Sequence, residues 1–188
     1  MIERSFKVFV VAALCAGIVA CRSKSEGSAS AEPAPNPSAP ERFAFELPPD
    51  FAPIELRGEG SESLRAPRGA RTEARAGGFD VRADPDFAVH VQTQPPALPE
   101  IAGRVEGARR VLEESNLIIF KSAGGYGFAL TLELVPEWDE NDRRRLACTS
   151  AGVEVASGTT RSQALRFSKG AVEKMVAACR SLKLPPLE

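Results

Sequence analysis

Histidine is almost absent from this chain, and its scarcity restricts the chemistry that the chain can perform. Among 188 residues there is one histidine, His90, together with four cysteines, one tryptophan and one tyrosine. A lone histidine without a second ligand of its kind argues against zinc held by nitrogen and sulfur ligands. No Gly-x-Ser-x-Gly motif or other nucleophile motif accompanies it. We therefore expect His90 to be a surface residue, and we expect no catalytic residues, no metal and no cofactor.

An excess of positive charge is also lacking. The chain has 24 lysines and arginines against 25 aspartates and glutamates, which gives a formal net charge of −1, and the two signs are interleaved. Nucleic-acid binding gains from a clustered basic face that releases counterions. We therefore expect no nucleic-acid partner.

The apolar run at the start of the chain is too short for a permanent membrane span. It extends from Val8 to Ala20, which as a helix is roughly 20 Å long against a hydrocarbon layer of roughly 30 Å. Arg4 and Lys7 precede the run and small residues end it, which is the order found in a secretory signal. We expect residues 1–20 to be a signal peptide.

The end of this run carries a family resemblance. Ile18-Val19-Ala20-Cys21 resembles the lipobox of bacterial lipoproteins. The resemblance implies a diacylglyceryl thioether on Cys21 and an acylated amine, which together supply the several chains that stable membrane anchoring requires. Arg22 follows instead of Asp, which in lipoproteins of Gram-negative bacteria favours the outer membrane. We expect a lipid-anchored protein of the cell envelope that faces the periplasm; the alternative is an ordinary signal peptide with an incidental cysteine.

Two cysteines remain for a folded domain, because Cys15 lies in the removed run and Cys21 carries lipid. They are Cys148 and Cys179. An exported compartment is oxidising, and a single pair without a leftover thiol favours a disulfide. Cys148 shares a strand face with Leu146, and Cys179 lies on the apolar stripe of the last predicted helix, so both are expected to point into one core.

The composition divides the mature chain into a tether and a domain. From Arg22 to Pro40 there is no Val, Ile or Leu, and four prolines occur among Ser, Ala and Glu residues. Such a segment cannot build a core, and in an extended form it would reach roughly 60 Å. We expect the lipidated cysteine and its tether over residues 21–42, and a single globular domain over residues 43–188.

Alternating apolar residues predict a mainly antiparallel sheet. Strands are expected at 79–81, 87–91, 117–120, 126–134, 146–148 and 153–156. Gly124-Gly125-Tyr126-Gly127 resembles a phosphate-binding loop, but a strand follows it, so we expect a hairpin turn there. Residues 43–78 are expected to supply one or two strands and a loose connection.

Two helices complete the predicted fold. Pro99 suits a first helical turn, and the stripe of Ile101, Val105, Ala108 and Leu112 predicts a helix over about 98–114. Ser168 as a cap, followed by the stripe of Val172, Val176 and Cys179, predicts a second helix over about 169–183. Because strands and helices are segregated along the chain, the fold class expected is α+β, a mainly antiparallel sheet with two packing helices.

An acidic loop contains the only tryptophan. Pro136 begins this loop, and Trp138 is followed directly by Asp139 and Glu140. A large aromatic at such a place is either folded down as a lid on the core or exposed as an anchor for a partner. The carboxylates offer oxygen ligands for calcium, but the loop lacks the glycine and the distal glutamate of an EF-hand. We expect Trp138, Asp139 and Glu140 to form a partner contact.

The C-terminal pattern carries a second resemblance. A strand with Cys148, followed by a helix from Val172 to Leu182, is similar to the end of small uncharacterised lipoproteins of Gram-negative bacteria, and more loosely to PsbP and Mog1-type domains, which are binding modules. The resemblance implies no activity. We expect a non-catalytic binding or assembly domain that is held to the membrane by its lipid and meets an envelope protein. A structural spacing role is the alternative, and a hydrolase is the least favoured class.

Overall fold

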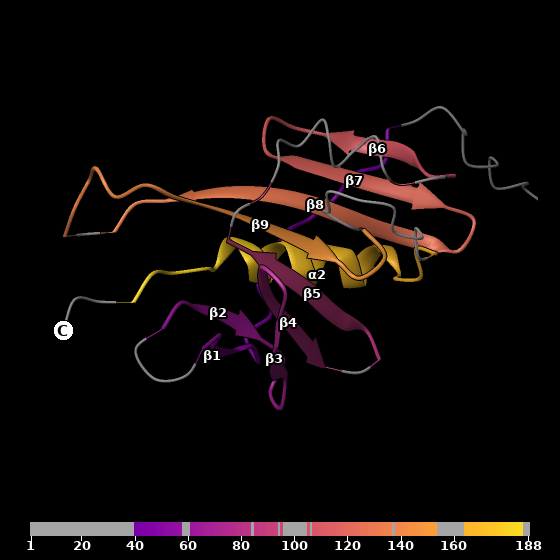
Figure 1. Ribbon diagram of the computed structural model, residues 1–188. Coiled ribbons are helices and arrows are strands. Elements are labelled where there is room, and N and C mark those ends of the chain that lie inside the picture. The colour runs from indigo at the N-terminus through magenta and orange to yellow at the C-terminus, as the bar shows by residue number, and fades with distance from the viewer. Residues whose placement is uncertain are drawn as a thin grey trace, which may run out of the picture. The chain divides into compact units, whose positions relative to one another are not determined.

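Seven antiparallel strands form one sheet within the part of the chain that the computed structural model describes, which is residues 40–57, 61–83, 85–93, 95, 105, 107–136, 138–153 and 164–185 (Figure 1). Their order across the sheet is β3-β4-β5-β9-β8-β7-β6. The strands are β3 (Arg71–Arg75), β4 (Gly78–Ala83), β5 (Phe87–Gln92), β6 (Arg109–Glu113), β7 (Leu117–Ser122), β8 (Gly125–Leu134) and β9 (Arg144–Ser150). A separate hairpin pairs β1 (Ala52–Glu55) with β2 (Ser63–Ala66), and the described helix is α2 (Lys169–Arg180).

The sheet consists of two meanders joined at one seam. Strands β3, β4 and β5 are successive neighbours, as are β6, β7, β8 and β9. The seam pairs β5 with β9, from Val89 opposite Ser150 to Gln92 opposite Ala147. The last strand of the described residues, β9, therefore lies in the middle of the sheet.

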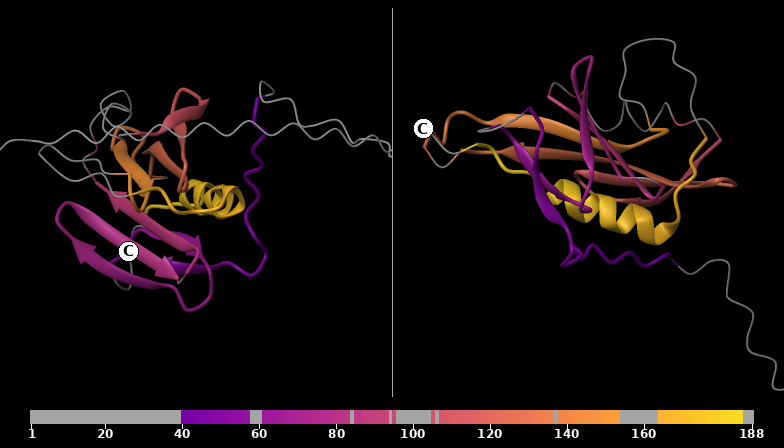
Figure 2. Two further views of the ribbon diagram at one scale, coloured as in Figure 1. Left: turned by 90° about the vertical axis from the view of Figure 1, so that its right-hand side faces the viewer. Right: turned by 90° about the horizontal axis from the view of Figure 1, so that it is seen from below.

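One face of the sheet packs against α2, as the two views of Figure 2 show. Alternate strand residues point to this face and form the main core with the apolar stripe of the helix. Its fully buried members include Val81, Val91, Phe128, Leu130, Val172 and Met175. A smaller core lies on the opposite face, where Ile118, Phe120 and Ala129 meet Val105, Val153 and Leu165.

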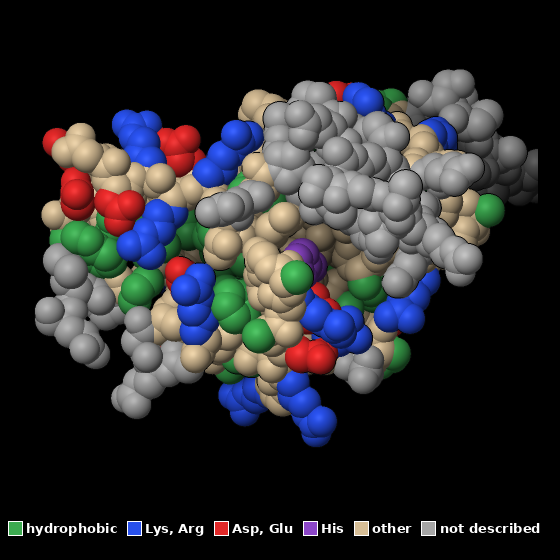
Figure 3. Space-filling model, viewed as in Figure 1, with side chains coloured by type: hydrophobic (Ala, Val, Ile, Leu, Met, Phe, Trp, Pro, Cys, Tyr) green, Lys and Arg blue, Asp and Glu red, His purple; other side chains and the backbone are tan. Residues whose placement is uncertain are grey.

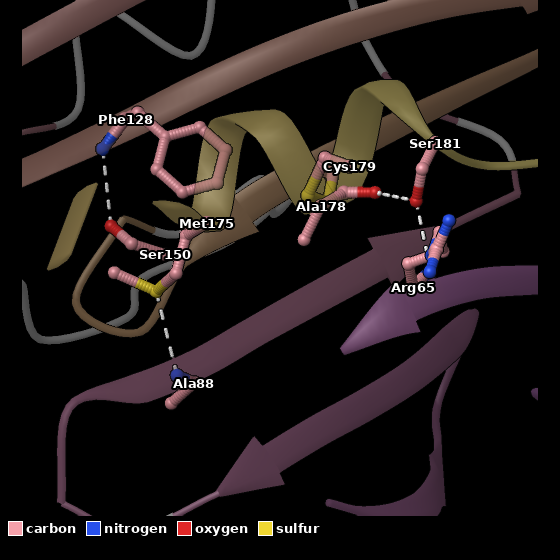
Figure 4. The surroundings of a disulfide bond; sticks show 9 residues. Arg65, Ala88, Phe128, Ser150, Met175, Ala178, Cys179 and Ser181 are labelled. Carbon is pink, nitrogen blue, oxygen red and sulfur yellow. Dashed lines mark hydrogen bonds between the residues drawn. A yellow bond between two sulfur atoms is a disulfide. The ribbon is translucent and has the colours of Figure 1, made fainter. Parts of the chain in front are cut away.

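Helix α2 confirms the second predicted helix. Ser168 has an extended backbone, and its side chain accepts a hydrogen bond from Ala171 N at 3.1 Å, so it is the expected cap. At the other end, Ser181 Oγ donates to Ala178 O and accepts from Arg65 N, at 2.6 Å and 2.8 Å (Figure 4). The bond from Arg65 N fastens the end of the helix to strand β2.

The first predicted helix is wrong where the structure describes it. Residues 109–113 form strand β6, which pairs with β7, whereas residues 98–104 and 106 lie outside the described residues. A bulge between Arg110 and Leu112 leaves both Val111 and Leu112 half-buried, so burial does not alternate along β6 as it does along a regular strand. Without that alternation, the spacing of Ala108 and Leu112 resembles that of a helical stripe. Gly107, with φ of +70°, also interrupts any helix through this region.

The other strand predictions differ in accuracy. Strands β4, β5, β7, β8 and β9 confirm five predicted segments, and the turn between β7 and β8 confirms the hairpin at Gly124. In the predicted strand at 153–156, Val153 is buried outside any strand and the remainder lies outside the described residues. Residues 43–78 hold three complete strands, more than expected, because β3 is an edge strand whose five residues are all exposed and carry no apolar alternation.

An extended segment, residues 41–47, runs beside α2 in both views of Figure 2. We call it the strap. Phe43 and Phe45 stack with centroids 6.2 Å apart, and the cations of Lys169 and Arg180 lie over their rings at 4.9 Å and 4.6 Å. Ala44 N donates to Glu173 Oε1 at 2.9 Å. Side-chain contacts to the helix therefore hold this segment without strand pairing.

The predicted disulfide between Cys148 and Cys179 is confirmed. It joins the centre of β9 to α2, with Cα atoms 6.1 Å apart (Figure 4). Both residues are fully buried in the main core. The bond therefore connects the sheet to the helix that covers it.

Candidate functional site

A two-stranded arm extends from the sheet. Strand β7 begins opposite Leu130, and β5 ends opposite Ala147, but β8 and β9 remain paired through Leu132–Leu146, Glu133–Arg145 and Leu134–Arg144. We call residues 132–146 the arm. Figures 1 and 2 show it projecting past the ends of the neighbouring strands. Along these three pairs, β8 and β9 pair with each other and with no other strand of the described residues.

The tip of the arm contains the tryptophan. Trp138 is half-buried, but within the described residues it is not among the side chains that pack against either core. Val135, at the start of the tip, is 47% exposed and is the one large hydrophobic residue of the described chain that is exposed. The tip therefore presents apolar surface outside the core.

Local hydrogen bonds shape the rest of the tip. Asp139 Oδ1 accepts from Asn141 N at 2.9 Å, and Asp139 O accepts from Asp142 N at 3.2 Å. Asp139 and Glu140 are exposed. Glu137 lies outside the described residues. The predicted contact residues Trp138, Asp139 and Glu140 thus share one hydrogen-bonded loop.

Arginines of the arm pair with its carboxylates, so the arm is less acidic than the sequence of its loop suggested. Arg143 binds Glu133 at 2.9 Å, and Arg144 binds Asp142 at 3.1 Å. Figure 3 shows acidic and basic side chains interspersed at this end of the face that it displays. Exposed pairs of this kind add little stability singly, but they fix the direction of the side chains.

A pocket of about 480 Å³ lies beside the base of the arm, on the β9 side. Four arginines line it, namely Arg57, Arg143, Arg144 and Arg145. The carboxylate in its wall is Glu62, 8% exposed, which lies 3.4 Å from Arg57 and 3.8 Å from Arg144. The pocket is therefore basic overall.

His90 lies in a second polar cluster, on the sheet face opposite α2. It is half-buried on β5, visible in purple in Figure 3, and its Nδ1 lies 2.8 Å from Asp80 Oδ1 on β4. Arg82 and Arg75 donate to the other carboxylate oxygen of Asp80 at 2.7 Å and 3.1 Å. Burial acts to raise the pKa of Asp80, but the hydrogen bonds from His90 and Arg82 outweigh it and hold this pKa below its ordinary value.

Thr149 lies directly across from His90 on β9. Thr149 is 1% exposed, and its Oγ1 has no hydrogen-bond partner among the described residues. The row Asp80, His90, Thr149 therefore places a carboxylate, an imidazole and a hydroxyl on adjacent strands. A carboxylate bonded to Nδ1 fixes the orientation of an imidazole ring, so Asp80 holds the ring of His90 in place.

The start of the strap forms a third charged cluster. Glu41 accepts from Lys121 at 2.6 Å and from Tyr126 at 2.8 Å. The hydrogen bond from Lys121 above all, with that from Tyr126, holds the pKa of Glu41 below its ordinary value although burial opposes this. The same bond to Glu41 raises the pKa of Lys121. These contacts begin inside the stretch expected to be tether.

The structure brings together some of the residues that the sequence indicated and leaves others apart. The Cys148–Cys179 pair is joined, and the three tip residues form one loop far along the chain from His90. Cys21 lies outside the described residues. Sequence reasoning missed Asp80 as the partner of His90, although the short turn between their two predicted strands would have set them opposite each other.

Comparisons with protein-family models, with curated proteins and with solved structures found no match for this chain. Within the described residues, no helix has the length and apolar character needed to cross a membrane.

Proposed function

We propose that this chain is a lipid-anchored envelope protein whose domain binds a partner protein without catalysis. The anchor is the acylated Cys21, exposed after removal of residues 1–20. The lipobox-like Ile18-Val19-Ala20-Cys21 supports this, and so does the disulfide, since such bonds persist in oxidising, exported compartments. The location proposed is the outer membrane, facing the periplasm.

The arm is the proposed contact surface, and one observation carries this proposal. The arm projects past the strands on both sides, and its tip holds Val135 and Trp138 away from the core. Exposed apolar side chains on a projecting loop are a usual feature of protein interfaces, and tryptophan is enriched among residues that dominate binding. Asp139 and Glu140 form the polar rim of the same surface.

The domain also needs reach to meet a partner away from the lipid. The stretch from Arg22 to Pro40, within the proposed tether over residues 21–42, spans roughly 60 Å when it is extended. The strap fixes the end of that tether to α2 through Phe43, Phe45 and the bond from Ala44 to Glu173. The strap therefore contacts the domain at α2 and not at the tip of the arm.

Site-specific photo-crosslinking in the native envelope tests the proposed surface. A photoreactive amino acid at position 135 or 140 is expected to give a discrete crosslinked product with another protein. The matched control is position 68, an exposed residue in the turn between β2 and β3. Equal crosslinking from position 68 and from the tip, or none from the tip, would reject the arm as the contact surface.

A further inference from the structure

We propose that the edge of β9 at the base of the arm, which pairs with no strand of the described residues, binds an extended, acidic segment of a protein partner as an added strand. This inference rests on the proposed function, because it names the chemistry of the partner that the arm would meet. It concerns the pocket beside β9 and not the tip loop.

The first observation is the open strand edge. The ladder between β5 and β9 stops at Gln92 opposite Ala147, and Thr93 N then donates to Gly77 O at 3.2 Å, toward β4. Strand β9 continues along Arg144, Arg145 and Leu146, for which the described residues provide a strand partner on the β8 side only. An unpaired edge presents backbone N–H and C=O groups that an extended peptide can bind.

The second observation is space beside that edge. The pocket of about 480 Å³ is lined by Arg144, Arg145 and Leu146 from β9 itself, and by Thr93 and Pro95 from the segment after β5. The pocket therefore lies beyond the end of β5, where a strand that continued the line of β5 would run beside β9. Leu146 is buried and supplies an apolar floor.

The third observation is charge. Arg57, Arg143 and Arg144 have side chains that are 52%, 67% and 42% exposed, so they can reach a ligand although Arg57 and Arg143 each have one acidic neighbour and Arg144 has two, Glu62 and Asp142. Arg145 is exposed and makes no ion pair with a described residue. Among the described residues that line the pocket there are four arginines and one carboxylate, that of Glu62. A partner segment that carries carboxylates fits this excess, because arginine binds carboxylates in a bidentate geometry.

The strand edge distinguishes a peptide from a simple anion. Arginines alone would bind phosphate or any carboxylate, but β9 offers backbone groups in addition, and side chains of an added strand alternate between the two sheet faces. Arg145 and Leu146 are successive residues of β9 and point to opposite faces, so a peptide that alternates acidic and apolar residues can direct its carboxylates to Arg145 and its apolar side chains to Leu146. This pattern defines the class of partner.

The test uses the full chain in nonionic detergent and, as the probe, a capped, fluorescently labelled hexapeptide of alternating glutamate and valine. Anisotropy is expected to show saturable binding, and hydrogen exchange is expected to slow at those amides of residues 144–146 that point away from β8. Arg145→Gln should weaken binding about tenfold, the usual effect of losing one charged hydrogen bond. Arg71→Gln, which removes an exposed charge on β3, is the matched control and should leave affinity unchanged.

Several results would overturn the proposal. One is equal binding of a backbone N-methylated hexapeptide, which keeps the charges but cannot pair with β9; another is equal binding of a lysine–valine hexapeptide. Three further results would overturn it too. They are absence of binding by the glutamate–valine peptide, tighter binding of a single-stranded oligonucleotide, and occupation of the edge by a second copy of the chain, seen as a dimer in sedimentation.

The two proposals can fail separately. If tip crosslinking persists while the peptide fails, this inference alone is wrong; if the peptide binds while tip crosslinking fails, the proposed tip surface is wrong.

Discussion

Cys148 and Cys179 join the central strand of the sheet to the helix that covers it, with both side chains fully buried. The bond closes a loop with a sequence separation of 31 residues. In the chain-entropy model such a loop stabilises the fold by about 3 to 4 kcal/mol. Urea unfolding with and without reductant should show this difference. The double variant Cys148→Ala, Cys179→Ala is the control and should not respond to reductant; peptide mapping without reduction that recovers both cysteines as free thiols would contradict the bond.

Anchoring is expected to depend on one particular thiol. Cys21→Ser should abolish both lipid attachment and signal cleavage, because the lipobox chemistry needs the sulfur of Cys21. Metabolic labelling with a fatty acid and the size of the chain on a gel measure both effects. Cys15→Ser, within the same apolar run, is the matched control and should be processed normally. Normal processing of Cys21→Ser would show that the segment is an ordinary signal peptide.

The buried hydroxyl of Thr149 is expected to cost stability. Because its Oγ1 lacks a partner among the described residues, Thr149→Val should raise the free energy of unfolding by about 1 kcal/mol. The adjacent Ser150 gives a control with the opposite sign: its Oγ accepts from Phe128 N at 3.1 Å, so Ser150→Ala should lower stability by about 1 to 3 kcal/mol. Chemical denaturation of both variants makes the comparison. A clear loss in Thr149→Val would mean that the hydroxyl is bonded in the folded protein.

The strap should respond to acid through Glu41. Its folded-state pKa is below its unfolded value, so its stabilising effect is present above an unfolded pKa of about 4.3 and is lost as the pH falls through the lower folded value. Glu41→Gln should therefore lower Tm at pH 7, and its effect should shrink in acid as the pH falls below about 4.3. Glu46→Gln, an exposed position on the same strap, should change Tm neither at pH 7 nor in acid. A pH-independent effect of Glu41→Gln would show that the charge is not what stabilises the strap.

The sequence predicted those elements whose apolar residues follow a regular period. The apolar alternation of β8 and the capped apolar stripe of α2 are visible without a structure, because these side chains pack on the main core, although the smaller core also buries Ala129 on the other face of β8. Strand β6 was misassigned because its bulge breaks the alternation, and β3 was missed because an exposed edge strand needs no apolar pattern. Local sequence reveals neither the bulge of β6 nor the edge position of β3, since both features depend on the neighbouring strand.

The candidate site was predictable only in part. The tip residues Trp138, Asp139 and Glu140 stood out as an acidic loop with an aromatic. The arm that carries them arises from the different lengths of β5, β7, β8 and β9, which is a property of strand register. In the same way, Arg57 and Arg145 are distant in sequence, and only the placement of β1 and β2 beside the sheet brings them to one pocket.

The central claim is that Trp138 anchors a partner, and one substitution measured in two ways tests it most directly. Trp138→Ala should leave the free energy of unfolding within about 0.5 kcal/mol of the unsubstituted chain, because the side chain lies outside both cores, and should abolish the crosslinked product formed from position 140. Phe128→Ala, at a fully buried core position, is the stability reference and should cost about 3 to 5 kcal/mol. A comparable loss in Trp138→Ala, or crosslinking that persists in it, would contradict the account.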